Sequence, residues 1–260
     1  MSRVTVIGVG NMGGAILDGL VAKGWPTSDL ATVDPAVDSA RSGVRHGTIE
    51  EMVPGADAVL VAVKPDAIAG LLGQVADHLD PGAVVISVAA GVSVATLESA
   101  LGTANPVARV MPNTPARVGR GVSIVSPGTH TGDDHLALVR SLLEAVGIVE
   151  VLPERLQDAA TGVSGSGPAY VFAMVDAMIE AGVQQGLPRP VATRLTVQTF
   201  LGASTMLDAG THPVELREQV SSPGGTTVQG LRALDRHGLR PAIADAVEAA
   251  RQRSEELGRS

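Results

Sequence analysis

The sequence predicts an α/β N-terminal half built on a doubly wound parallel sheet, followed by an all-α C-terminal half. Short apolar or β-branched runs alternate with helical patterns as far as Val151, and from Pro153 onward only helical patterns remain. A glycine-rich turn also follows the first predicted strand directly. Because 260 residues suffice for two domains, we predict domains at residues 1–152 and 153–260.

Composition excludes several classes of partner. Hydrophobic residues make up 45% of the chain, enough for a core, but aromatic residues only 2%, too few for a surface that stacks nucleic-acid bases. The net charge of −8 also argues against a phosphate-backbone partner. There is no cysteine, the histidines lack metal-ligand spacing, and no signal peptide or apolar membrane-length run is present. We therefore expect a cytoplasmic protein that binds no metal, nucleic acid or membrane.

A glycine-rich loop joins the first predicted strand, residues 3–7, to the first predicted helix, residues 15–22. Between them lies the run Gly8-Val9-Gly10-Asn11-Met12-Gly13. In this context Gly8 makes a tight turn, Gly10 lets a pyrophosphate approach, and Gly13 lets helix and strand pack closely. Such turns also occur for packing reasons alone, but the strand–loop–helix order favours a Rossmann-type dinucleotide site.

An acidic residue ends the second predicted strand, residues 30–33. Asp34 lies about 20 residues beyond the glycines, where an acid would bind the ribose 2′-hydroxyl of NAD. Asp34-Pro35 could instead be only a turn, and Arg41 or Arg45 could contact the 2′-phosphate of NADP. The sequence therefore favours NADH slightly and leaves NADPH open.

Two continuous apolar runs, residues 58–63 and 83–88, are typical of parallel strands buried on both faces. They end at Lys64-Pro65 and at Ala89-Ala90-Gly91, where open α/β sheets bind ligands, and the small residues would admit a flat nicotinamide ring. The remaining predicted elements of this half are strands at 107–110, 122–125 and 148–151 and a helix at 133–146.

Beyond Pro153 the predicted helices cover residues 168–185, 190–209, a short segment from Pro213, 227–236 and 241–257. Apolar positions at helical spacing are more often core than site. Their number is large for a small bundle, which suggests an intertwined dimer.

A polar loop, residues 221–227, separates two of these helices. Pro223 followed by Gly224 and Gly225 predicts a tight turn. The N–H groups of Gly224, Gly225 and Thr226 would then open onto a helix N-terminus, which favours an anion. A glycine turn without a ligand is the alternative on residue types alone, and the dinucleotide loop is what favours the anion site.

The residues available for proton transfer are few. The only lysines are Lys23 and Lys64, and Tyr170 has Met174 four residues on, so no Tyr-x-x-x-Lys pair exists. β-Hydroxyacid dehydrogenases share this layout but use a lysine on the first helix of the second half, which is absent here. A ketone or alcohol would need such a group, whereas an imine can arrive protonated and needs orientation and hydride.

Together these motifs resemble the pyrroline-5-carboxylate reductase family over essentially the whole chain. The matching runs are Gly8-x-Gly10-Asn11-Met12-Gly13, Ala62-Val63-Lys64-Pro65, Ser87-Val88-Ala89-Ala90-Gly91, Arg109-x-Met111-Pro112-Asn113-Thr114-Pro115, Ser164-Gly165-Ser166-Gly167-Pro168-Ala169-Tyr170 and Ser221-Ser222-Pro223-Gly224-Gly225-Thr226-Thr227. The last two are the most specific. The resemblance implies reduction of L-1-pyrroline-5-carboxylate to L-proline, the final step of proline biosynthesis, by hydride transfer from NAD(P)H to the cyclic imine carbon.

The resemblance also implies residue roles. Thr227 would hydrogen-bond the ring nitrogen and orient the imine, and Glu154 would lie near the substrate. Residues that would hold the substrate carboxylate are Ser222, Gly224, Gly225, Thr226 and Thr227. Residues along the cofactor would be Gly8, Gly10, Asn11, Met12, Gly13, Val63, Lys64, Pro65, Ala89 and Ala90, with Gln219 at the nicotinamide end. One departure is Asp34, where many members have a small or polar residue.

The implied assembly is a homodimer through the helical domain, with each active site built from both subunits, and often a decamer. Three alternatives stay open on the sequence. They are a reductase of another imine or 2-hydroxy acid, a dinucleotide sensor without turnover, and a structural dimer module without cofactor.

Overall fold

The computed structural model describes residues 2–35 and 43–259. Contacts within the chain divide it into two compact units, residues 1–166 with 249–260 and residues 167–248. The predicted boundary between residues 152 and 153 rests on the change from strand to helix patterns, and it stays a prediction about the domains. Each unit is described on its own below.

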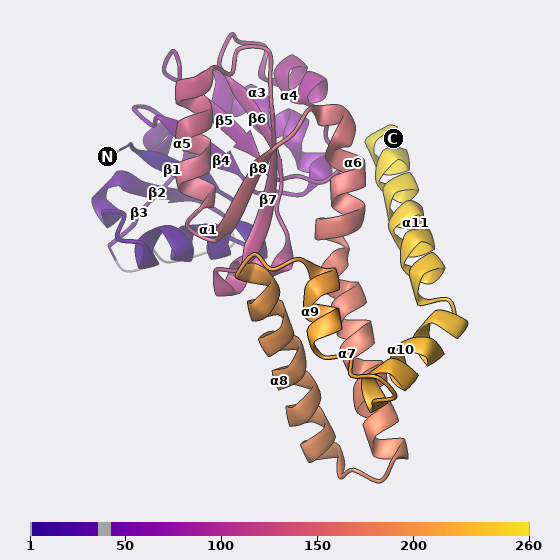
Figure 1. Cartoon of the computed structure of the whole chain (residues 1–260). Coiled ribbons are helices and arrows are strands. Elements are labelled where there is room, and N and C mark those ends of the chain that lie inside the picture. Colours follow the sequence, from indigo (N-terminus) through magenta and orange to yellow (C-terminus); the bar gives the residue numbers. More distant parts are fainter. Residues whose placement is uncertain (1, 36–42, 260) are drawn as a thin grey trace. The chain divides into compact units, whose positions relative to one another are not determined.

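The first unit is built on one sheet with the order β3-β2-β1-β4-β5-β6-β7-β8 (Figure 1). The strands are β1 Val4–Ile7, β2 Leu30–Val33, β3 Arg45–His46, β4 Ala58–Val61, β5 Val84–Ser87, β6 Val107–Met111, β7 Gly121–Pro127 and β8 Gly147–Val151. Strands β1 to β6 pair in parallel, with β2 and β4 on either side of β1. This order confirms the predicted doubly wound sheet.

The seven predicted strands are present, with ends shifted by a few residues. The run predicted at 58–63 ends at Val61, and the one predicted at 122–125 extends over Gly121–Pro127. Strand β3 was not predicted, because two residues show no alternation. The direction of β7, antiparallel to β6 and parallel to β8, was not predicted either.

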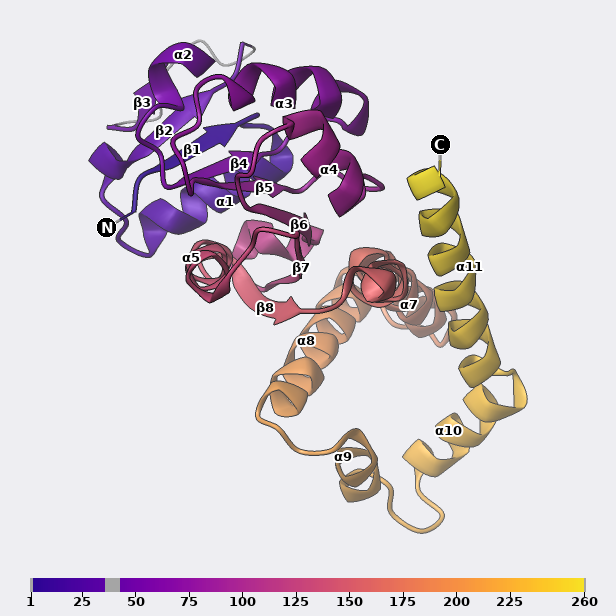
Figure 2. The same ribbon diagram turned by 90° about the horizontal axis from the view of Figure 1, so that it is seen from above.

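Helices cover both faces of the sheet. Those of the first unit are α1 Asn11–Ala22, α2 Ile49–Met52, α3 Ile68–Ala76, α4 Val94–Leu101, α5 Asp133–Leu143, α6 Gln157–Ala160 and residues 249–259 of α11 Leu239–Arg259, with a 3₁₀ turn at Thr114–Val118 and a π-helical turn at Thr161–Gly165. Seen from above, α2, α3 and α4 lie on one side of the sheet and α1 and α5 on the other (Figure 2). The predicted helix at 133–146 ends at Leu143.

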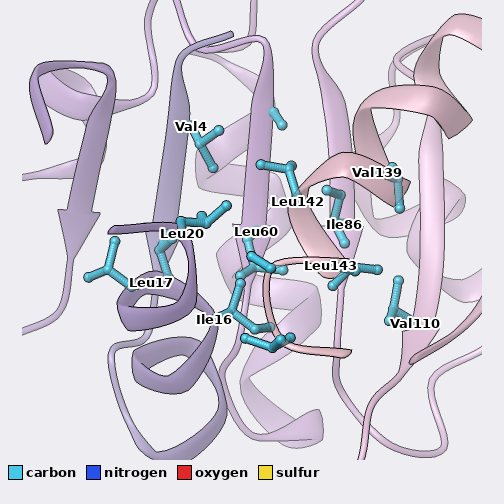
Figure 3. Packing of buried hydrophobic residues seen from close by; sticks show 14 of the residues in the cluster. Val4, Ile16, Leu17, Leu20, Leu60, Ile86, Val110, Val139, Leu142 and Leu143 are labelled. Carbon is cyan, nitrogen blue, oxygen red and sulfur yellow. The ribbon is translucent and has the colours of Figure 1, made fainter. Parts of the chain in front are cut away.

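Strand side chains alternate between two hydrophobic cores. Val4 and Val6 of β1 join the core that contains Leu17 and Leu20 of α1, all fully or almost fully buried. Figure 3 shows Val4, Leu17 and Leu20 in this core. Ile7 joins the core on the opposite face. Both faces of the sheet are therefore covered, as the continuous apolar strand sequences predict.

The second unit consists of helices. They are α7 Gly167–Gln184, α8 Arg189–Asp208, α9 Pro213–Gln219, α10 Thr226–Arg236 and the part of α11 Leu239–Arg259 up to residue 248. Arg189 donates to both carboxylate oxygens of Glu180, at 2.5 and 3.0 Å, which joins the start of α8 to α7. This ion pair holds the pKa of Glu180 below its usual value.

Few side chains of the second unit are buried. Within residues 167–248, all of which the structure describes, only Ala192 and Thr196 are buried. Large apolar side chains are exposed on α7 and α8, among them Phe172 at 66% and Leu201 at 60%. Exposed apolar surface of this extent indicates an interaction surface. In the described parts of the chain, the helices are all too short or too polar to cross a membrane.

We expect Leu17→Ala to lower the free energy of unfolding by about 3 kcal/mol, because the side chain is fully buried between α1 and the sheet. Urea unfolding at fixed protein concentration measures the change. Val21→Ala on the same helix is the control, since Val21 is 41% exposed. Equal losses for the two variants would contradict the packing described here.

Candidate functional site

The glycine-rich loop packs against the end of β4. Gly8 has φ +90°, and a Cβ there would lie 2.6 Å from the carbonyl oxygen of Ala62. The Gly8 N–H donates to Val33 O at 2.9 Å, and a Cβ on Gly13 would overlap Gly8 O. Both glycines are therefore required by the protein's own backbone, as the motif predicts.

Gly10 is different. It is the N-cap of α1 with φ −71°, and a Cβ there would meet nothing within 4 Å. The protein's own packing does not require glycine at this position. Open space beside a helix N-terminus, from which Asn11 and Met12 continue, fits the close approach of a dinucleotide pyrophosphate.

Asp34 is tied to the same loop. Its half-buried carboxylate accepts a hydrogen bond from the Val9 N–H at 2.7 Å, so the end of β2 holds the glycine-rich loop directly. Sequence reasoning missed this contact, although the adjacency of β1 and β2 would have suggested it. Arg41, the first alternative for NADP, lies outside the described residues. Arg45 is exposed on β3.

The other predicted cofactor residues of this unit follow neighbouring strands. Val63, Lys64 and Pro65 come after β4, and Ala89 and Ala90 come after β5. Since β1, β4 and β5 are adjacent and parallel, these residues and the glycine-rich loop share the carboxyl edge of the sheet. This is the edge where doubly wound sheets bind ligands.

Glu154 has two protein partners. Its Oε1 atom accepts from Arg109 Nη1 at 2.8 Å and from the Val94 N–H at 2.7 Å. The Arg109 side chain is only 12% exposed, and Val94 is the first residue of α4. Glu154 therefore neutralises the charge of the nearly buried Arg109 guanidinium and caps the N-terminus of α4. Its predicted place near the substrate stays a prediction.

Asn113 joins two of the motifs. This nearly buried side chain donates to Ser164 O at 2.9 Å and accepts from the Val122 N–H at 2.9 Å. Asn113 follows β6, and Ser164 lies in the π-helical turn before α7. Neither motif predicts a role for Asn113 from the sequence alone. The structure shows that it anchors one motif to the other.

The polar loop of the second unit forms the predicted turn. The Gly225 N–H donates to Ser222 O at 3.0 Å, and Gly224 has φ +71°, as in a type II turn with Pro223 at its second position. Helix α10 then begins at Thr226 with no side-chain cap. The first-turn N–H groups lack the acceptors of a helix interior, which leaves them able to bind an anion.

One predicted donor is corrected by this geometry. The sequence predicts that the Gly225 N–H opens onto the anion, but this group is used within the turn. Thr226 is exposed and Thr227 is half-buried in the first turn of α10, and Gln219 ends α9. The predicted site residues therefore form two groups, one in each unit.

Side chains that could transfer protons mostly have structural partners. The hydroxyl of Tyr170, the only tyrosine, donates to Ala246 O at 3.3 Å. His212 caps α9 by accepting from the Val214 N–H, and His46 Nδ1 lies 3.0 Å from Thr32 Oγ1. Within the described residues, no three His, Asp or Glu side chains form a cluster that could hold a metal ion.

Comparison with known proteins gives matches along the whole chain. A family model described as pyrroline-5-carboxylate reductase dimerisation matches residues 154–257, and one described as coenzyme F420-dependent NADP oxidoreductase matches residues 3–91. The pyrroline-5-carboxylate reductase of Corynebacterium melassecola is 40% identical over 269 residues, covering 100% of both chains. That of Methanosarcina acetivorans is 37% identical, covering 99% of this chain and 98% of its own.

Solved structures agree. A pyrroline-5-carboxylate reductase from Coxiella burnetii is 35% identical with a TM-score of 0.96, covering 100% of this chain and 99% of its own. A Plasmodium falciparum pyrroline carboxylate reductase with NADP bound is 30% identical with a TM-score of 0.87, covering 99% and 98%. A Mycobacterium tuberculosis 3-hydroxyisobutyrate dehydrogenase, 18% identical over 72% of this chain and 67% of its own with a TM-score of 0.53, shares the fold alone.

We expect Gly10→Ala and Gly13→Ala to separate dinucleotide binding from folding. Alanine at Gly10 meets no protein atom but is a poorer N-cap than glycine, so the free energy of unfolding should fall by no more than about 1 kcal/mol while dinucleotide affinity falls at least about tenfold. Alanine at Gly13 should lower both, because its Cβ overlaps Gly8 O. Thermal unfolding and calorimetric titration measure the two effects. If the dinucleotide affinity of Gly10→Ala were unchanged, the pyrophosphate would not bind at this loop.

Proposed function

This chain belongs to the pyrroline-5-carboxylate reductase family, and we propose that it reduces L-1-pyrroline-5-carboxylate to L-proline with Thr227 as the orienting residue. It is an oxidoreductase that uses NAD(P)H. The feature that supports the residue roles is the turn at Ser222–Gly225, which opens onto the N-terminus of α10. A glycine turn that binds no anion would need no threonine pair at that position.

The substrate carboxylate would be held by the first turn of α10. The N–H groups of Thr226 and Thr227 and the hydroxyl of Ser222 are donors of the type that binds a carboxylate at a helix start. Gly224 and Gly225 keep this turn open to a ligand, because neither presents a side chain. Binding through backbone donors fits a small carboxylated ring better than a large substrate.

Thr227 would act on the ring nitrogen. Its hydroxyl oxygen can accept a hydrogen bond from the protonated ring nitrogen and thereby orient the imine carbon. The bound NAD(P)H supplies the hydride. The only lysines of the chain are Lys23 and Lys64, and the hydroxyl of its only tyrosine, Tyr170, donates to Ala246 O, which is consistent with a substrate that arrives protonated.

The remaining residues would be divided between cofactor binding and substrate binding. The cofactor would lie along the glycine-rich loop, Lys64-Pro65 and Ala89-Ala90, with Gln219 at its nicotinamide end and Glu154 near the substrate. Residues 1–152 would form the cofactor domain and 153–260 the helical substrate and dimerisation domain. The protein would work in the cytoplasm.

Self-association is supported by the dimerisation model over residues 154–257. The exposed apolar residues of α7 and α8 are the surface that a second copy would cover. We propose that each active site draws residues from both subunits, and that dimers assemble further into a decamer.

Cofactor choice would favour NADH. The Asp34 carboxylate is held beside the glycine-rich loop by Val9, where it can accept a hydrogen bond from a ribose 2′-hydroxyl and repel a 2′-phosphate. Membership of the family implies the use of NAD(P)H, whereas the preference for NADH over NADPH is inferred from Asp34 alone.

We expect Thr227→Val to lower kcat about 100-fold with a change in cofactor Kd of less than about twofold, because only the hydroxyl is lost. Stopped-flow or steady-state oxidation of the cofactor with pyrroline-5-carboxylate measures kcat. Thr227→Ser is the matched control and should retain most of it. If Thr227→Val kept full kcat, the hydroxyl would have no orienting role.

We expect Asp34→Asn to raise the ratio of kcat/KM for NADPH to that for NADH about tenfold, because asparagine removes the charge but can still accept from the Val9 N–H. Asp34→Ala should weaken both cofactors, because the loop also loses its acceptor. Parallel initial rates with the two cofactors give the ratio. An unchanged ratio in Asp34→Asn would refute the preference.

A further inference from the structure

A cavity of about 470 Å³ lies at the end of β2, and two carboxylates line it. One is Asp34, and the other is Glu50 in the first turn of α2. We propose that Glu50 is a second determinant of cofactor choice, an inference that rests on the proposed function. Together with Asp34 it accepts the ribose hydroxyls of NADH and excludes the 2′-phosphate of NADPH from this cavity.

The described lining of the cavity includes no basic group of the lysine or arginine type. Thr48 and Gln74 are uncharged, and the ring of His46 lies against Thr32. Arg45 lines a separate cavity with Arg3 and Pro54. Adjacent residues of a strand point to opposite faces, so Arg45 faces away from the cavity that His46 lines. This removes Arg45 as a ligand for a 2′-phosphate.

The two consecutive acids of α2 have different tasks. Glu51 closes a capping box, because its Oε2 atom accepts from the Thr48 N–H at 3.0 Å. Glu50 lines the cavity, and a hydrogen bond from the Thr48 side chain lowers its pKa below the usual value. Glu50 is therefore ionised at neutral pH.

Charge explains the discrimination. A phosphate monoester has a charge of about −1.5 to −2 at neutral pH, whereas a ribose hydroxyl is neutral and donates a hydrogen bond to a carboxylate. Two carboxylates in one cavity therefore favour the hydroxyl and repel the phosphate. Discrimination by repulsion is a common means of specificity.

The test compares Glu50→Gln with Glu51→Gln in the full-length chain. Both variants lose one negative charge, but the amide oxygen introduced by Glu51→Gln can still close the capping box, and Glu51 does not line the cavity. We expect Glu50→Gln to raise the NADPH-to-NADH ratio of kcat/KM about three- to tenfold, and Glu51→Gln to change it less than about twofold.

Binding provides a second readout that does not depend on turnover. Calorimetry with 2′,5′-ADP and 5′-AMP should show that Glu50→Gln tightens 2′,5′-ADP about three- to tenfold relative to 5′-AMP. The gain should shrink as ionic strength rises, because surface charges are screened over about 10 Å at 0.1 M salt.

Two outcomes would overturn the inference. One is an unchanged ratio and unchanged relative affinity in Glu50→Gln, with a raised ratio in Asp34→Asn. The other is an equal effect of Glu51→Gln, which would reduce the effect to net charge. Failure of the wild-type chain to reduce pyrroline-5-carboxylate would instead refute the proposed function, and the nucleotide titrations would still decide the role of Glu50.

Discussion

The first unit depends on the close approach of the glycine-rich loop to the ends of three neighbouring strands. Gly8 lies against Ala62 beyond β4, and Gly13 lies against Gly8. Asp34 at the end of β2 holds Val9 through a hydrogen bond of 2.7 Å. Because both sheet faces are buried, the strands that set these positions cannot shift without disturbing the cores. The rigid sheet therefore fixes the position of a loop that has no hydrophobic core of its own.

The second unit, unlike the first, has almost no hydrophobic core of its own. It leaves large apolar side chains of α7 and α8 exposed, and within residues 167–248 just two side chains are buried. Hydrophobic burial is the main favourable term in folding, and the exposed apolar side chains of α7 and α8 form a surface that association with another protein surface would bury. Its polar loop before α10 is held by a local turn instead. A local hydrogen bond therefore holds the turn at Ser222–Gly225 although few side chains around it are buried.

The sequence predicted features that depend on local patterns. The buried parallel strands, the turn at Pro223 and Gly224, and the glycine requirement at Gly13 all follow from residue type and spacing. It failed where structure depends on pairing across the fold. The two-residue strand β3 has no pattern of its own, and the reversed direction of β7 is set by its neighbours. Polar contacts between distant residues, such as Glu154 with Arg109, have no sequence period at all.

The acidic residues of the first unit show that the number of charges in a segment does not identify a ligand-binding site. Asp34 and Glu50 line one cavity, whereas Glu51 beside the latter is used in a helix cap. Glu154 compensates the nearly buried guanidinium of Arg109. A carboxylate whose oxygens are used by backbone N–H groups or a guanidinium stabilises the fold, and one that faces a cavity can also select a ligand. Asp34 accepts from the Val9 N–H and also lines the cavity, so a substitution that removes its acceptor oxygens, such as Asp34→Ala, changes the loop and the cavity together, whereas Asp34→Asn changes the charge alone.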